Sequence, residues 1–221
     1  MDDDLDMPQP LTRVKKLTKG RRSSPFLLMG KPEFALRIMG VIEAWSHTEI
    51  AMGRILANCL RAESSAGIAM YLSLSGGPAR RAALQAAAER KLPKKKLALF
   101  NLVMKAIKPV RDRRNDFVHG VWWHSDEMPD ALLWTSGDIN LEKYEKSLKK
   151  HRSDDEDIMV YKIADLDRAL GDAEDAVACV HGIGVLIHRG HAHAHEQTLK
   201  QLLARPLIVR CGGLPTTQKK K

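Results

Sequence analysis

Apolar residues recur every three or four positions over most of this sequence, a spacing that places them on one face of an α-helix. The first such stripe follows Pro32 and Glu33, which suit a first helical turn, and runs to about Arg61. Glu49 lies on the same stripe. Its apolar members are Ile38, Val41, Ile42, Trp45, Met52, Ile55, Leu56 and Cys59. We therefore expect a long first helix that packs one face into a core.

Three further helices are predicted in the middle of the chain. Residues 64–74 and 79–91 form the first two, and the third runs from about residue 95 to residue 119. Pro109 interrupts the third pattern, so we expect a kink or a junction between two helices there. The inward stripe of this third helix consists of Val103, Ile107, Val110, Arg114 and Phe117. Gly120 is expected to end the helix in the left-handed conformation.

After residue 120 the pattern changes to short apolar runs of the kind that form β-strands. We expect a hairpin-like excursion built from three runs, which are Val121-Trp122-Trp123, Ala131-Leu132-Leu133-Trp134 and Ile158 to Ile163. A polar loop over residues 142–157 lies before the last run. Asp165 suits the cap of a final long helix, and residues 197–203 are expected to extend that helix.

These elements predict a mainly α fold, an up-and-down helical bundle with a short β-hairpin-like excursion before the last helix. Three parts follow from the pattern. Residues 1–30 lack periodicity and are expected to form a flexible tail, residues 31–196 form the helical domain, and residues 197–221 form a C-terminal extension with a basic tail.

Composition narrows the class of protein. Lysine and arginine number 36 against 27 acidic residues, which gives a net charge of +9 and favours polyanionic partners such as RNA. Three widely spaced cysteines predict neither a disulfide framework nor a zinc site. The N-terminus is acidic and unlike a secretory signal, and no stretch predicts a membrane span, so we expect a cytoplasmic protein without membrane contact. No cofactor is expected.

The candidate chemistry lies at the end of the fourth predicted helix, over residues 95–119, where Arg114, Asn115 and His119 follow Arg111 and Arg113. RNA carries its own nucleophile, the 2′-hydroxyl, so cleavage needs only a proton carrier and charge stabilisation. An imidazole can carry the proton, and a guanidinium can hold the phosphate by a forked contact. We assign His119 as acid/base, Arg114 to the phosphate and Asn115 as the residue that orients His119 or binds the phosphate. Arg111 and Arg113 are assigned to substrate binding.

The spacing within this segment predicts a dimer. Arg114 and His119 are five residues apart, so on an ideal helix their side chains diverge by roughly 140°. One chain therefore aims them poorly at a single phosphate. Two such helix ends that meet across a two-fold axis would allow each cleft to draw on both chains.

The segment Arg114-Asn115-x-x-x-His119, followed by Gly120 and a nearby tryptophan, resembles the HEPN superfamily of helical nucleic-acid-associated domains. The similarity spans residues 32–195, with Trp45 and Glu49 inside the first helix. It implies a helical bundle that dimerises and places two Arg/His pairs in one basic cleft. Many such domains are metal-independent endoribonucleases of toxin–antitoxin, defence or RNA-processing systems, in some of which an antitoxin protein is the partner. Others are non-catalytic modules that bind RNA, nucleotide or protein.

Plainer interpretations of the same residues remain open at this level. Arg114 can form an internal ion pair with Glu49 or Glu43, and His119 can simply follow the helix dipole. The side chains of His191, His193 and His195 alternate, and an exposed polar helix end is favoured over a metal site. Three tryptophans, Trp122, Trp123 and Trp134, can stack on unpaired bases or pack in the core.

Overall fold

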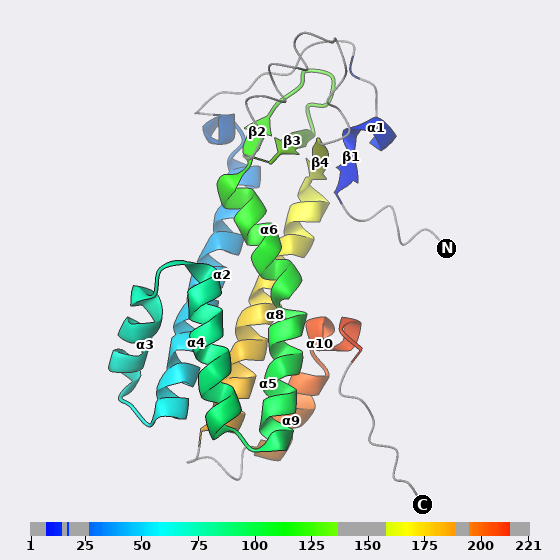
Figure 1. Ribbon diagram of the computed structural model, residues 1–221. Helices are drawn as coiled ribbons and strands as arrows, with labels where there is room; N and C mark the ends of the chain where they lie inside the picture. Colours follow the sequence, from blue (N-terminus) through cyan, green and yellow to red (C-terminus); the bar gives the residue numbers. More distant parts are fainter. Residues whose placement is uncertain (1–7, 15–16, 18–26, 137–157, 189–194, 213–221) are drawn as a thin grey trace, which may run out of the picture. The chain divides into compact units, whose positions relative to one another are not determined.

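The mainly α fold class is confirmed by the computed structural model, which describes residues 8–14, 17, 27–136, 158–188 and 195–212 (Figure 1). The helical elements are α1 (Leu11–Val14), η2 (Leu27–Gly30), α2 (Pro32–Leu60), α3 (Ser64–Ser73), α4 (Gly76–Lys91), α5 (Lys94–Ala106), α6 (Lys108–His119), α8 (Ile163–Ile187), α9 (His195–Leu203) and α10 (Pro206–Arg210). The strands are β1 (Gln9–Pro10), β2 (Val121–Trp123), β3 (Ala131–Thr135) and β4 (Met159–Lys162).

The contacts group these elements into two compact units, whereas the sequence predicted one helical domain over residues 31–196. The first unit comprises the chain up to Ile42 together with Asp112–Gly171, and the second comprises Glu43–Arg111 together with the chain from Asp172 onwards. Helices α2, α6 and α8 each contribute residues to both units. Each unit is described separately below.

The first unit contains a four-stranded antiparallel sheet in the order β1-β4-β3-β2. Because neighbouring residues of a strand point to opposite faces, the sheet has two distinct sides. On one side lies an apolar cluster of Leu11, Ala131, Leu133, Ile158 and Val160, against which Leu17, Trp123 and Met128 pack. On the other side Trp122 and Trp134 are cross-strand partners, and Phe117 of α6 contacts both Trp122 and Tyr161.

The N-terminal segment is partly built into this sheet, which corrects the prediction of a flexible tail for the described residues 8–14 and 27–30. Gln9 and Pro10 pair with β4, and the Leu11 backbone N–H donates to the Ile158 carbonyl at 2.7 Å. The Leu11 side chain is fully buried. Edge pairing and the burial of this one leucine hold the segment, and neither leaves a helical or long-strand pattern in the sequence.

The fourth predicted helix, expected over residues 95–119, divides in two at Ile107. Helix α5 ends at Ala106, and α6 begins at Lys108 with Pro109 in its first turn. A proline there costs no helical hydrogen bond, because the first amides of a helix have no partner within it. Pro109 therefore marks a junction between two helices, one of the two outcomes expected.

In the second unit, helix α2 ends in a left-handed residue that is not glycine. Arg61 has a φ of 57°. The Ala62 N–H donates to the Ala57 carbonyl at 3.0 Å, and the Arg61 N–H points to the Asn58 carbonyl at 3.4 Å. This pairing is the Schellman arrangement that closes the last turn of a helix. Helix α3 then approaches α2 so closely that a Cβ on Gly67 would lie 2.3 Å from the Cβ of Ala57.

The C-terminal helices are part of the second unit, which differs from the predicted extension over residues 197–221. Helix α10 contacts α5 and α9, and Leu202, Leu207 and Ile208 are buried. The Asp175 carboxylate of α8 accepts the Leu207 N–H at 2.9 Å, so it caps α10 from another helix. Residues 197–203 belong to the separate helix α9 rather than to an extension of α8. The predicted basic tail over residues 212–221 lies outside the described residues except for Gly212, and the polar loop over residues 142–157 lies outside them entirely.

Candidate functional site

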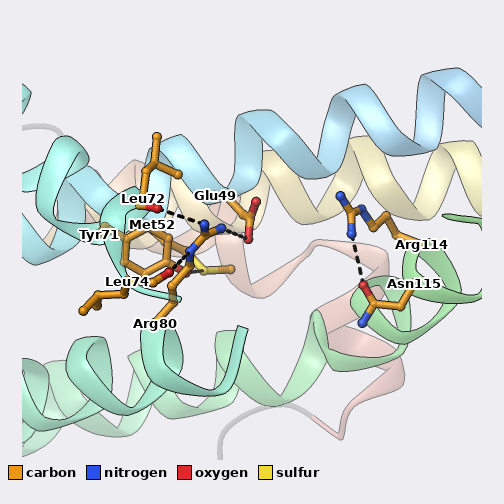
Figure 2. A network of polar contacts seen from close by, with 8 residues as sticks. All are labelled: Glu49, Met52, Tyr71, Leu72, Leu74, Arg80, Arg114 and Asn115. Carbon is orange, nitrogen blue, oxygen red and sulfur yellow. Dashed lines mark hydrogen bonds and ion pairs between the residues drawn. The ribbon is translucent and has the colours of Figure 1, made fainter. Parts of the chain in front are cut away.

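The segment that carries the predicted chemistry forms the last two turns of α6. Residues 113–115 are half-buried, while His119 is exposed as the final helical residue. The Arg114 Nη1 donates to the Asn115 Oδ1 at 3.2 Å (Figure 2). Asn115 was predicted to orient His119 or to bind phosphate, and its amide instead contacts the guanidinium beside it. The structure therefore brings Arg114 and Asn115 together, and it leaves the His119 imidazole without a hydrogen bond to any described residue.

Arg114 carries an incomplete set of partners. Its Nε atom is buried and has no hydrogen-bond partner among the residues that the structure describes. Within the described part of the chain Arg114 forms no ion pair, and its one hydrogen bond is to a neutral amide. A buried guanidinium N–H without a partner costs free energy that the fold does not recover locally. The guanidinium of Arg114 therefore has hydrogen-bonding capacity that the described residues do not use.

The acids proposed as alternative partners of Arg114 are engaged elsewhere. Glu49 accepts a hydrogen bond from the Nη1 of Arg80 at 3.0 Å, in the second unit (Figure 2). Glu43 lies 4.0 Å from His47, and both side chains are largely exposed. The alternative of an ion pair between Arg114 and Glu49 or Glu43 would join residues of different units, and it stays untested.

Acidic and basic groups of α6 alternate around the site. Burial raises the pKa of Asp116, and the neighbouring Asp112 raises it further, while the positive charge of Arg113 lowers it. On the side of the sheet that carries Trp122 and Trp134, burial raises the pKa of the Tyr161 hydroxyl to about 12. The positive charge of Arg113 thus acts on Asp116 and Tyr161, both of which lie near it.

The end of α6 is fastened to the sheet by an indole. The Trp134 Nε1 donates to the Asp116 carbonyl at 2.9 Å, and the Gly120 N–H donates to the same oxygen at 2.8 Å. A Cβ on Gly120 would lie 1.7 Å from the Trp134 Nε1. Gly120 is not among the left-handed glycines of the described chain, so the predicted reason for this glycine is wrong. It is needed because the indole approaches its Cα too closely for a side chain.

The three tryptophans have different environments. Trp122 is 8% exposed and packs edge-on against Tyr161, so it belongs to the core. The Trp123 Nε1 donates to Thr135 Oγ1 at 3.0 Å, on the opposite side of the sheet. Trp134 donates a hydrogen bond to the backbone of the turn that carries the candidate site, and Trp122 packs against Phe117 of the same turn. The sequence places Gly120 directly before the strand predicted over residues 121–123. That adjacency did not indicate which side chain would contact the glycine.

The remaining predicted residues are Arg111 and the three histidines near the C-terminus. Arg111 is half-buried on the first turn of α6, which belongs to the second unit, and it has interactions of its own. His191 and His193 lie outside the described residues. His195 opens α9, and its buried Nε2 has no hydrogen-bond partner in the described ranges. In the chain as described, no group of three or more histidine, cysteine or acidic side chains is arranged to hold a metal ion.

A second polar network, which the sequence did not predict, surrounds Arg80 (Figure 2). Besides its pair with Glu49, Arg80 donates from Nη2 to the Leu72 carbonyl at 3.0 Å and from Nε to the Leu74 carbonyl at 3.2 Å. Its guanidinium also lies 5.9 Å from the centre of the Tyr71 ring. All three of its nitrogens are satisfied, so Arg80 is a structural clamp on the end of α3.

None of the helices in the described ranges combines the length and the apolarity that crossing a bilayer would require. Comparisons of the chain with family models, with curated proteins and with solved structures gave no match.

Proposed function

We propose that this chain is a metal-independent endoribonuclease of the HEPN type, which cleaves RNA through attack of the 2′-hydroxyl. The observation that carries the proposal is the state of Arg114: a half-buried guanidinium with a buried, unpartnered Nε and no ion pair within the described residues. A cation that stabilises the fold is normally satisfied, as Arg80 is. An RNA phosphate would supply the two acceptor oxygens that a guanidinium fork binds.

In the proposed reaction, the 2′-oxygen bonds to phosphorus while the bond from phosphorus to the 5′-oxygen breaks. One imidazole removes the proton of the 2′-hydroxyl, and a protonated imidazole gives a proton to the departing 5′-oxygen. The Arg114 cation stabilises the negative charge that accumulates on the phosphorane oxygens. The products are a 2′,3′-cyclic phosphate and a 5′-hydroxyl, and the sum of protons is unchanged.

A homodimer follows from the same geometry. Arg114 and His119 point in directions that differ by roughly 140° on a regular helix, and α6 is regular up to His119. A second copy of the chain would add a second His119 and a second Arg114 to one cleft, and would provide separate imidazoles for the two proton transfers. In a toxin or defence setting, an antitoxin protein would silence the enzyme by covering this exposed helix end.

The test is cleavage of RNA in the presence of a chelator by the intact protein and by four variants. We expect His119→Ala and Arg114→Ala each to lower the rate by at least about 100-fold, which is typical for loss of an acid/base or of a charge-stabilising group. The matched controls His47→Ala and Arg90→Ala change exposed residues of the second unit and should cleave as the intact protein does. Equal activity of all five proteins would refute the assignment, and binding without cleavage would support a non-catalytic module instead.

A further inference from the structure

We infer that Trp134 is a positioning residue for His119, and that it acts by holding the last turn of α6 through its indole N–H. The inference rests on the proposed function for its kinetic consequence, whereas its structural part stands on the contacts alone. Trp134 does not touch the reacting atoms in this account. It acts through the backbone that carries the imidazole.

The first step concerns the carbonyl that Trp134 binds. The final carbonyls of a helix have no amide of the same helix to accept from, so the last turn is its least constrained part. The Asp116 carbonyl opens that turn. It accepts two donors, the Gly120 N–H at 2.8 Å and the Trp134 Nε1 at 2.9 Å. One donor closes the turn, and the other connects the turn to a strand.

The second step concerns the strand. Trp134 pairs with Trp122 on one side and with Met159 of β4 on the other, so it occupies an inner strand of the sheet. Its neighbours Leu133 and Thr135 are 0% and 5% exposed. The indole is therefore held by a well-packed element, and it transmits that position to α6 through one hydrogen bond.

The third step concerns the space that the indole requires. A Cβ at Gly120 would overlap the Trp134 Nε1, at 1.7 Å. The residue after His119 must therefore be glycine for the indole to reach the helix end. Glycine there would otherwise loosen the chain, because it has the greatest backbone freedom. The indole removes that freedom at the residue next to the imidazole.

The last step concerns His119 itself. Its imidazole is exposed and forms no hydrogen bond to any residue that the structure describes. The position of the ring is then set by the backbone of the last turn and by the rotamer, not by a side-chain partner. Displacement of a catalytic group by about 1 Å can cost about 100-fold in rate. Loss of the indole donor should therefore reduce turnover without weakening the binding of RNA.

The experiment compares Trp134→Phe with Trp123→Phe in the full chain. Both changes remove an indole donor from the same sheet, but Trp123 donates to Thr135 Oγ1 on the opposite side. Amide hydrogen exchange of Gly120 and the imidazole NMR signals of His119 report the last turn directly. Steady-state cleavage of RNA in a chelator reports turnover and KM separately.

For Trp134→Phe we expect exchange of the Gly120 amide to accelerate at least about tenfold, a shift of the His119 signals, and a fall in kcat of about 10- to 100-fold with KM within about twofold. Trp123→Phe should alter none of these. Unchanged exchange and unchanged His119 signals in Trp134→Phe would overturn the inference, as would altered exchange with an undiminished kcat. Should the intact protein cleave no RNA, the proposed function fails, and the NMR comparison still decides whether Trp134 positions His119.

Discussion

Replacement of Arg114 by methionine should make the protein more stable, although Arg114 is half-buried and carries a charge. Most core-facing substitutions lower stability, so the expected sign is unusual. It follows from the partners of the guanidinium: a buried Nε with no acceptor and one hydrogen bond, to Asn115 at 3.2 Å. Methionine retains a flexible apolar stem of similar reach and removes the unsatisfied group.

The magnitude follows from two opposed contributions. A buried N–H without a partner costs about 1–3 kcal/mol, and its removal returns that amount. The lost hydrogen bond to Asn115 contributes about 0.5–1.5 kcal/mol, and the half-buried Asn115 amide can bind water in exchange. The free energy of unfolding should therefore rise by about 1 kcal/mol. For a chain of this size that corresponds to an increase in Tm of about 2–4 °C.

The assay is urea unfolding followed by circular dichroism, with Arg90→Met as the matched control. Arg90 is exposed on α4, so its replacement should change stability by less than about 0.5 kcal/mol. Equal slopes of the unfolding free energy against urea concentration show that the variants unfold between comparable states. A loss of more than about 1 kcal/mol in Arg114→Met at an unchanged slope would refute the reasoning, because it would mean that the guanidinium stabilises the fold.

Three further results are expected. Arg80→Met should lower the free energy of unfolding by about 2–4 kcal/mol in urea, because it leaves Glu49 without its cation and two carbonyls without donors; a change below about 0.5 kcal/mol would contradict the clamp. A thiol reagent at neutral pH should label Cys211 rapidly. It should label Cys59 and Cys179 only on unfolding, because both thiols are buried and burial raises their pKa. Rapid labelling of the Cys211→Ser variant would contradict this prediction. Asp116→Asn should raise Tm at pH 7 but not at pH 3, because a raised pKa means that the charged carboxylate opposes folding above that pKa; an equal effect at both pH values would exclude this cause.

The periodic elements could be predicted from the sequence because burial on one face imposes a repeating pattern. The stripe on α2 and the junction at Pro109 are of this kind. Strand β1 could not be predicted, because two paired residues and one buried leucine after them produce no periodic pattern of apolar positions. The capping of α10 by Asp175 likewise joins residues that the sequence separates widely, and only the packing of the helices brings them together.

The candidate site was predictable in its residues and only partly in its contacts. Arg114 and His119 stand out because a cation on an inward stripe and an imidazole at a helix end are chemically unusual. The partner of Glu49 was not predictable, because the turn between α3 and α4 decides that Arg80 reaches it. The role of Gly120 was misjudged for a similar reason: the approach of an indole from β3 depends on strand pairing, which the glycine itself does not encode.

The most direct test of the central claim compares one RNA with its fully 2′-O-methylated counterpart, both incubated with the intact protein and a chelator. The account predicts fragments of the RNA that end in a 2′,3′-cyclic phosphate and a 5′-hydroxyl, and no cleavage of the methylated strand or by His119→Ala. Cleavage of the methylated strand, or RNA cleavage that persists at full rate in His119→Ala, would contradict it.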